Sequence, residues 1–94
     1  MSVGLLVVDC HIENGFSLKD KRKVLLGLTK KIRENFNVAI AETKYQDLWQ
    51  RTELSIVLVN TNYKEIERNY EKIIEFIQKD PRIRVLNYET TALY

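Results

Sequence analysis

The most restrictive feature of this sequence is how its hydrophobic period changes along the chain. Apolar residues alternate, as in strands, over 3–13, 38–43, 53–60 and 82–88. They recur every three or four residues, as in amphipathic helices, over 18–35 and from 63 to about 79. The resulting order predicts an α+β, ferredoxin-like split βαβ (β-α-β-β-α-β) fold. Its four-stranded antiparallel sheet would carry both helices on one face, with the first and third strands at the centre.

The length of 94 residues accommodates one such domain, over residues 1–94. The longest near-uniform apolar stretch, residues 3–8, is far shorter than the roughly 20 residues of a membrane span. No signal-peptide pattern is visible, and the single cysteine, Cys10, cannot form an internal disulfide. We therefore expect a cytoplasmic protein that does not associate with membranes.

The sheet face that the helices leave open is predicted to be partly apolar. Leu5 and Val7 of the first strand would point outward beside Val57 and Val59 of the third. An apolar patch on adjacent central strands is typical of an interface, so we expect a homodimer about a two-fold axis. The alternative is that Trp49, or the tail residues Leu93 and Tyr94, folds over this face. Trp49 is also a candidate interface residue in its own right, because tryptophan often anchors a partner.

The first helix carries most of the positive charge. Residues 17–33 contain seven basic residues and one acid, Asp20, so this segment is +6 and the rest of the chain is −4. A basic helix can bind a phosphate backbone, although a charge run is more often a solvated surface. The candidate nucleic-acid-binding residues are Lys19, Lys21, Arg22, Lys23, Lys30 and Arg51. In the alternative, an internal ion-pair network with Asp9, Glu13, Glu42 or Asp47 would make Arg22 and Arg51 structural.

Ser17 followed by Asp20 indicates where this helix starts, because the serine oxygen can accept a free backbone N–H of the first turn. We expect Phe16, just before this cap, to pack back onto the helix as a hydrophobic staple.

Asp9, His11 and Glu13 alternate along one strand face and are of the types that bind metals. Successive side chains on that face lie about 6.5–7 Å apart, so Glu42 or Asp47 would have to complete a site. Ion pairs with basic residues are the simpler explanation. No nucleophile accompanies His11 and no glycine-rich phosphate loop occurs, so we predict no catalytic residue, metal, cofactor or known small-molecule substrate.

Three motifs carry a family resemblance: SLKDKR at 17–22, FNVAIAE at 36–42 and QDLWQR at 46–51. Together they resemble the YlxP-like (DUF503) family of small bacterial proteins, from about Leu5 to Leu86. The resemblance implies a ferredoxin-like fold and no established enzyme activity. It also implies, through the frequent proximity of the family's genes to translation and ribosome-maturation genes, a role around ribosomal RNA.

These observations favour a non-enzymatic accessory factor that binds RNA or a ribosomal particle through the basic first helix. The first alternative is a homodimeric interaction module that uses the open sheet face. The second is a small metal- or ligand-binding enzyme built on Asp9, His11 and Glu42.

Overall fold

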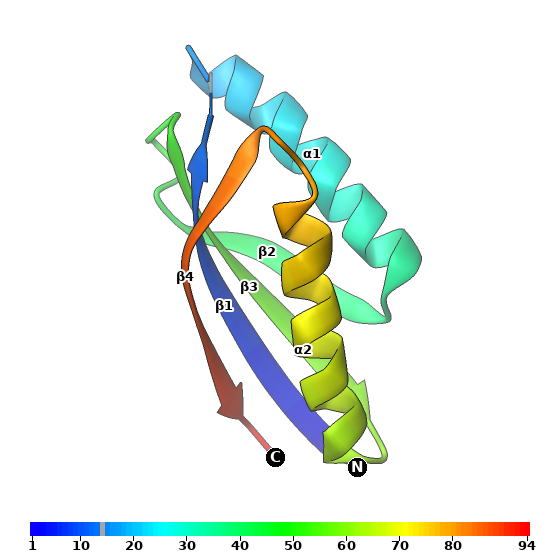
Figure 1. Cartoon of the computed structure of the whole chain (residues 1–94). Coiled ribbons are helices and arrows are strands. Elements are labelled where there is room, and N and C mark those ends of the chain that lie inside the picture. Colours follow the sequence, from blue (N-terminus) through cyan, green and yellow to red (C-terminus); the bar gives the residue numbers. More distant parts are fainter. Residues whose placement is uncertain (14) are drawn as a thin grey trace.

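The computed structural model describes residues 1–13 and 15–94. Its elements are β1 (Ser2–Ile12), α1 (Leu18–Asn35), β2 (Val38–Lys44), β3 (Arg51–Asn60), α2 (Tyr63–Gln78) and β4 (Ile83–Ala92). The strands form one antiparallel sheet in the order β2-β3-β1-β4, and both helices cover the same face (Figure 1). This confirms the ferredoxin-like split βαβ prediction, including the central position of β1 and β3.

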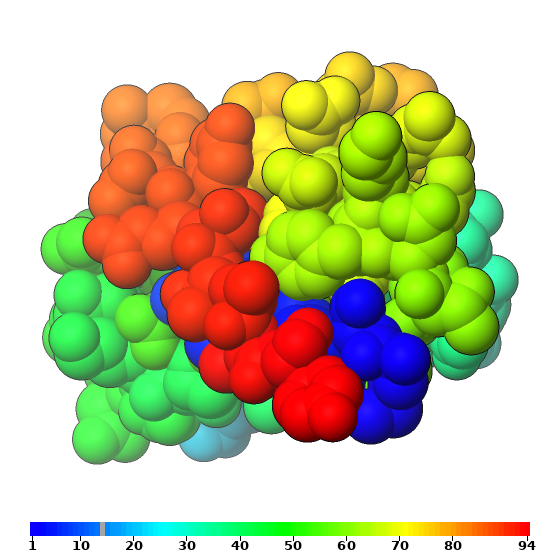
Figure 2. Space-filling model, turned by 90° about the horizontal axis from the view of Figure 1, so that it is seen from below, coloured from blue at the N-terminus to red at the C-terminus, as the bar shows by residue number. Residues whose placement is uncertain are grey.

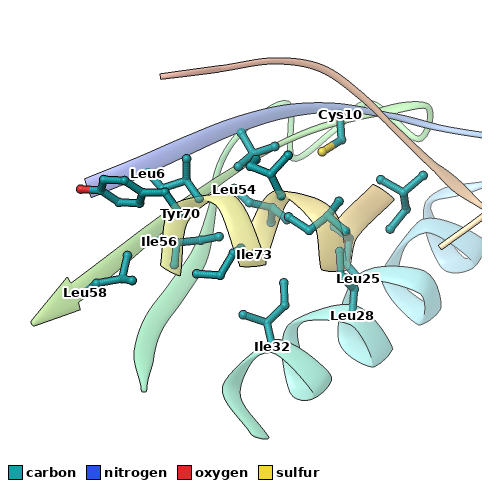
Figure 3. Packing of buried hydrophobic residues seen from close by; sticks show 14 of the residues in the cluster. Leu6, Cys10, Leu25, Leu28, Ile32, Leu54, Ile56, Leu58, Tyr70 and Ile73 are labelled. Atoms are coloured by element: carbon teal, nitrogen blue, oxygen red, sulfur yellow. The ribbon is translucent and has the colours of Figure 1, made fainter. Parts of the chain in front are cut away.

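The core lies between this sheet face and the helices. Every second residue of β1 and β3 points into it, and Leu6, Val8 and Ile56 are fully buried. Figure 3 shows these side chains meeting the apolar stripes of α1 and α2. Cys10 belongs to the same layer, where burial raises the pKa of its thiol to about 12. The thiol is therefore protonated at neutral pH, as expected of a cysteine that serves as a small apolar residue.

Both helices begin at a side-chain cap. Ser17 Oγ accepts a hydrogen bond of 3.1 Å from the backbone N–H of Asp20, as the sequence predicted. Asn62 Oδ1 accepts one of 2.9 Å from the N–H of Lys64. Each cap satisfies one of the four backbone donors that a helix start leaves free, which explains why α1 and α2 begin where they do.

The last strand is longer than its hydrophobic pattern predicted. β4 runs to Ala92, because Glu89, Thr90 and Thr91 pair with β1 although their side chains are exposed. Backbone hydrogen bonds of 2.8 and 3.1 Å then join Leu93 and Tyr94 to Val3. Figure 2 shows the C-terminal residues, in red, beside the N-terminal ones, in blue. Leu93 and Tyr94 therefore prolong the edge of the sheet, where both are exposed.

The other strand ends differ from the predictions by one or two residues. β1 ends at Ile12, and Asn14, at which the sequence predicts a break, lies outside the described residues. β3 begins at Arg51 because Arg51 and Thr52 pair with His11 and Cys10 of β1. Within the described part of the chain, neither helix combines the length and the apolar character that crossing a membrane requires.

Candidate nucleic-acid interface

Exposed basic side chains run along α1 on the side opposite its buried residues. Positions 19, 22, 23, 30 and 33 fall within one sector of the helix, about 100° wide, with positions 22 and 23 at its two borders. They extend over about 21 Å at a rise of 1.5 Å per residue. We call this set the basic stripe; it consists of Lys19, Arg22, Lys23, Lys30 and Arg33.

The basic stripe has little internal charge compensation. Its shortest approach to an acid in the described residues is from Lys30 Nζ to Glu34 Oε1, at 4.0 Å, and both side chains are well exposed. An exposed pair of this kind contributes little and is screened by salt. Asp20 lies in the first turn, but its carboxylate accepts a hydrogen bond from the backbone N–H of Phe16 at 3.3 Å. The stripe therefore presents a net positive surface to solvent.

Lys21 does not belong to this surface, and its assignment to a phosphate-binding set was wrong. Only 1% of the residue is exposed. Its ammonium donates 2.6 Å hydrogen bonds to the carbonyl oxygens of Tyr45 and Leu48, and it lies 2.8 Å from Glu42 Oε2. That carboxylate also accepts from the buried Thr52 hydroxyl at 2.6 Å. A charge this deeply buried requires such partners, so Lys21 fastens α1 to the segment between β2 and β3.

Arg51 also has a structural role. Its guanidinium donates to both carboxylate oxygens of Asp9, at 2.9 and 2.6 Å, and lies 4.6 Å from the centre of the Tyr45 ring. These hydrogen bonds hold the pKa of Asp9 below its usual value. The ion-pair alternative is thus correct for Arg51, whereas Arg22 remains exposed on the basic stripe.

The candidate metal ligands are also involved in ion pairs. Glu13 Oε1 accepts from Arg84 Nε at 2.9 Å, and His11 Nε2 lies 3.9 Å from the other Glu13 oxygen. Asp9 is held by Arg51, and Glu42 by Lys21. Among residues 1–13 and 15–94, no three His, Cys, Asp or Glu side chains form a group that could hold a metal ion.

The open sheet face divides into an apolar and a polar half. In the apolar half Leu5 lies directly opposite Val57, and Val3 lies opposite Val59, which is 51% exposed. Val7 pairs with Ser55 at the boundary. In the polar half the Thr43 hydroxyl hydrogen-bonds to Glu53 and Ser55, which suits a surface in contact with water.

Trp49, the other candidate interface residue, is not part of this apolar half. It precedes β3, and the start of β3 lies about 20 Å along the strand from Val57. Its ring instead lies against that of Phe16, with centroids 6.5 Å apart. Phe16 is 79% exposed, so the expected staple onto α1 is replaced by this aromatic pair.

A family model described as "Protein of unknown function (DUF503)" matches residues 3–90. The chain belongs to the DUF503 family. It is 36% identical over 81 residues to "Uncharacterized protein YlxP" of Bacillus subtilis (strain 168), which covers 86% of this chain and 88% of that relative. The family suggested by the three motifs is confirmed, and DUF503 membership brings no established activity.

The position of Lys21 in the sequence of this DUF503 chain already indicates that the residue is buried. Lys21 lies three residues after Leu18 and four before Leu25, and so falls on the apolar stripe of α1 rather than beside it. A lysine at that position must either extend to solvent or find buried partners. The pairing of Phe16 with Trp49 has no comparable signal, because it joins two segments far apart in the chain.

Proposed function

We propose that this DUF503 protein is a cytoplasmic, non-enzymatic accessory factor that binds RNA, free or within a ribosomal particle, through the basic stripe of α1. The observation that supports the proposal is the alignment of five exposed cations along one helix face. RNA phosphates form a linear array of negative charge, which such a row of cations can contact at several points.

The energetics of this contact are those of counterion release. Each phosphate that a basic side chain neutralises frees condensed cations, and for single strands the logarithm of the affinity falls by about 0.7 per phosphate for each tenfold rise in salt. Five contacts therefore predict a slope of about −3.5. Affinity would fall about a hundredfold between roughly 50 and 200 mM salt.

The test compares two charge-reversal variants by fluorescence anisotropy with a labelled RNA. Lys23→Glu with Lys30→Glu reverses two charges of the basic stripe. Lys64→Glu with Lys72→Glu makes the same change in charge on exposed positions of α2. We expect the first variant to bind at least tenfold more weakly and with a flatter salt dependence, and the second to stay within about threefold of wild type. Equal losses in the two variants, or no binding by wild type at about 50 mM salt, would overturn the proposal.

A second candidate function rests on a different observation, the apolar half of the open face. Leu5, Val57 and Val59 lie on adjacent central strands, and a self-complementary patch of this kind suits a two-fold homodimer. Sedimentation equilibrium at micromolar concentration should then give a dimer for wild type and a monomer for Val57→Glu. A wild-type protein that stays monomeric would exclude this interface.

A further inference from the structure

Two aromatic rings are exposed where α1 begins. Phe16 is 79% and Trp49 is 36% exposed, and their planes are inclined by 32°. Exposing rings to water is unfavourable, and aromatic side chains on a surface are typical of binding sites. Phe16 directly precedes the cap of α1, and this end of α1 lies away from the two termini (Figure 1).

A hollow of about 270 Å³ adjoins Trp49. The apolar residues Leu48 and Trp49 line it together with the polar residues His11, Gln50 and Arg51. Its volume is below the range of about 300–1,000 Å³ that is usual for drug-sized ligands. A flat heteroaromatic ring with polar edges matches this combination of size and chemistry, and a nucleobase is such a ring.

The walls of the hollow are held in place by contacts already described. Lys21 binds the carbonyl oxygen of Leu48, which adjoins Trp49, and Asp9 fixes the guanidinium of Arg51. The backbone N–H of Ile12 donates to the carbonyl oxygen of Gln50 at 2.8 Å. A site fixed before the ligand arrives loses less conformational entropy on binding.

The aromatic pair is continuous with the basic stripe. Phe16 lies three residues before Lys19, the first residue of the stripe. An RNA strand whose phosphates follow α1 would therefore reach the two rings at the start of the helix. A base can enter only if it is unpaired, because the bases of a duplex are stacked and buried in the helix.

We infer that Phe16 and Trp49, with the hollow beside Trp49, receive an unpaired base of single-stranded RNA whose backbone lies on the basic stripe. This inference rests on the proposed function and assigns its substrate class: single-stranded rather than double-stranded RNA. Stacking on aromatic rings tolerates any base, so the site selects for strand state and not for sequence.

Trp49 is the single tryptophan of the chain, so its fluorescence reports on this site directly. The probes are an unstructured oligouridylate of about 12 nucleotides and an RNA duplex of about the same length, both at low salt. We expect the oligouridylate to quench Trp49 fluorescence, and the duplex to bind by anisotropy without quenching. Phe16→Ala should lower the affinity for the oligouridylate about tenfold and leave the affinity for the duplex unchanged.

Three further variants complete the experiment. Tyr94→Ala removes an equally exposed aromatic ring at the opposite end of the molecule and should change neither affinity. Phe16→Tyr should keep the affinity for the oligouridylate and Phe16→Leu should lose it, which separates ring stacking from apolar bulk. Thermal unfolding of each variant checks that it folds.

The inference and the proposed function fail in different ways. Equal effects of Phe16→Ala on both RNAs, or no quenching by a bound oligouridylate, would overturn the single-strand site. The proposed function would survive that result if the Lys23→Glu, Lys30→Glu variant still binds both RNAs more weakly than wild type. Failure of the wild-type protein to bind either RNA would overturn both.

Discussion

α1 and α2 cover the same face of the sheet, but they are attached to it by different means. α1 is fastened by a polar anchor, the ammonium of Lys21 on Glu42 and on two backbone carbonyls. α2 is attached by close packing, because Tyr70 and Ile66 contact Gly4 of β1. The polar anchor also positions the Trp49 segment, so the attachment of α1 and the candidate binding site depend on the same residue.

The outer faces of the two helices differ as well. Apart from the buried Lys21, α1 carries six basic and two acidic residues, whereas α2 carries three basic and four acidic ones. On α2, Arg68 pairs with Glu65 one turn away, which is typical of a solvated surface. The outer face of α2 is therefore nearly balanced in charge, whereas that of α1 is strongly positive.

Removing the polar anchor of α1 should have the largest effect on stability. Lys21→Ala removes the ammonium from the carbonyls of Tyr45 and Leu48 and from the Glu42 carboxylate, which keeps its hydrogen bond from Thr52. Breaking a buried ion pair in this way costs about 3–5 kcal/mol. Urea unfolding measures the loss, and Lys23→Ala, two residues further along the helix and exposed, should stay within about 0.5 kcal/mol of wild type. Similar values for the two variants would show that Lys21 is not an anchor.

The close packing of α2 should be the next most sensitive feature. A Cβ atom at Gly4 would overlap the Tyr70 hydroxyl and lie 2.6 Å from Ile66 Cγ2. Gly4→Ala should therefore cost about 1–3 kcal/mol of unfolding free energy. Adding Tyr70→Phe removes the hydroxyl and should recover part of that loss. A Gly4→Ala protein as stable as wild type would mean that α2 can shift without cost.

The sequence predicted the layout of this fold better than its attachments. Each strand and helix that borders the core has a strong apolar periodicity, so its position could be predicted from the sequence. α1 was predicted at its observed bounds of Leu18–Asn35. The end of β4 was missed because Glu89, Thr90 and Thr91 gain their pairing from β1 and show no apolar alternation of their own. The partners of Lys21 lie 24 and 27 residues away, at positions that only the tertiary fold brings near.

Gly27 of α1 differs from Gly4 of β1, because it has open space around it. A Cβ atom at Gly27, in the middle of α1, would meet nothing within 4 Å. Since glycine costs a helix up to about 1 kcal/mol relative to alanine, Gly27→Ala should stabilise the protein by about that amount. For a domain of this size this corresponds to a melting temperature about 4–8 °C higher. Calorimetry that finds no gain would indicate that α1 needs flexibility at this point.

Two aspartate–arginine pairs, one across β1 and β3 and one just after α2, should give the smallest effect, and it depends on pH. Hydrogen bonds from Arg51 lower the pKa of Asp9, and those from Arg82 lower the pKa of Asp80, both from an ordinary value of 3.8. Each pair therefore stabilises the folded protein above that value and loses this contribution as the pH falls through the lower folded-state pKa. Unfolding free energies of Asp9→Asn and Asp80→Asn should lie below wild type at about pH 6, with the gaps narrowing at about pH 3.

The losses of unfolding free energy in Asp9→Asn and Asp80→Asn should also differ in size at about pH 6. Asp80 and Arg82 are two residues apart, so their attraction persists in part in the unfolded chain and contributes less to the difference between the two states. Asp9 and Arg51 are 42 residues apart and meet only in the folded sheet. Asp9→Asn should therefore be the more destabilising substitution, and it should also disturb the hollow beside Trp49 through Arg51. An equal or larger cost for Asp80→Asn would show that the Asp9–Arg51 pair contributes no more to stability than a local turn contact.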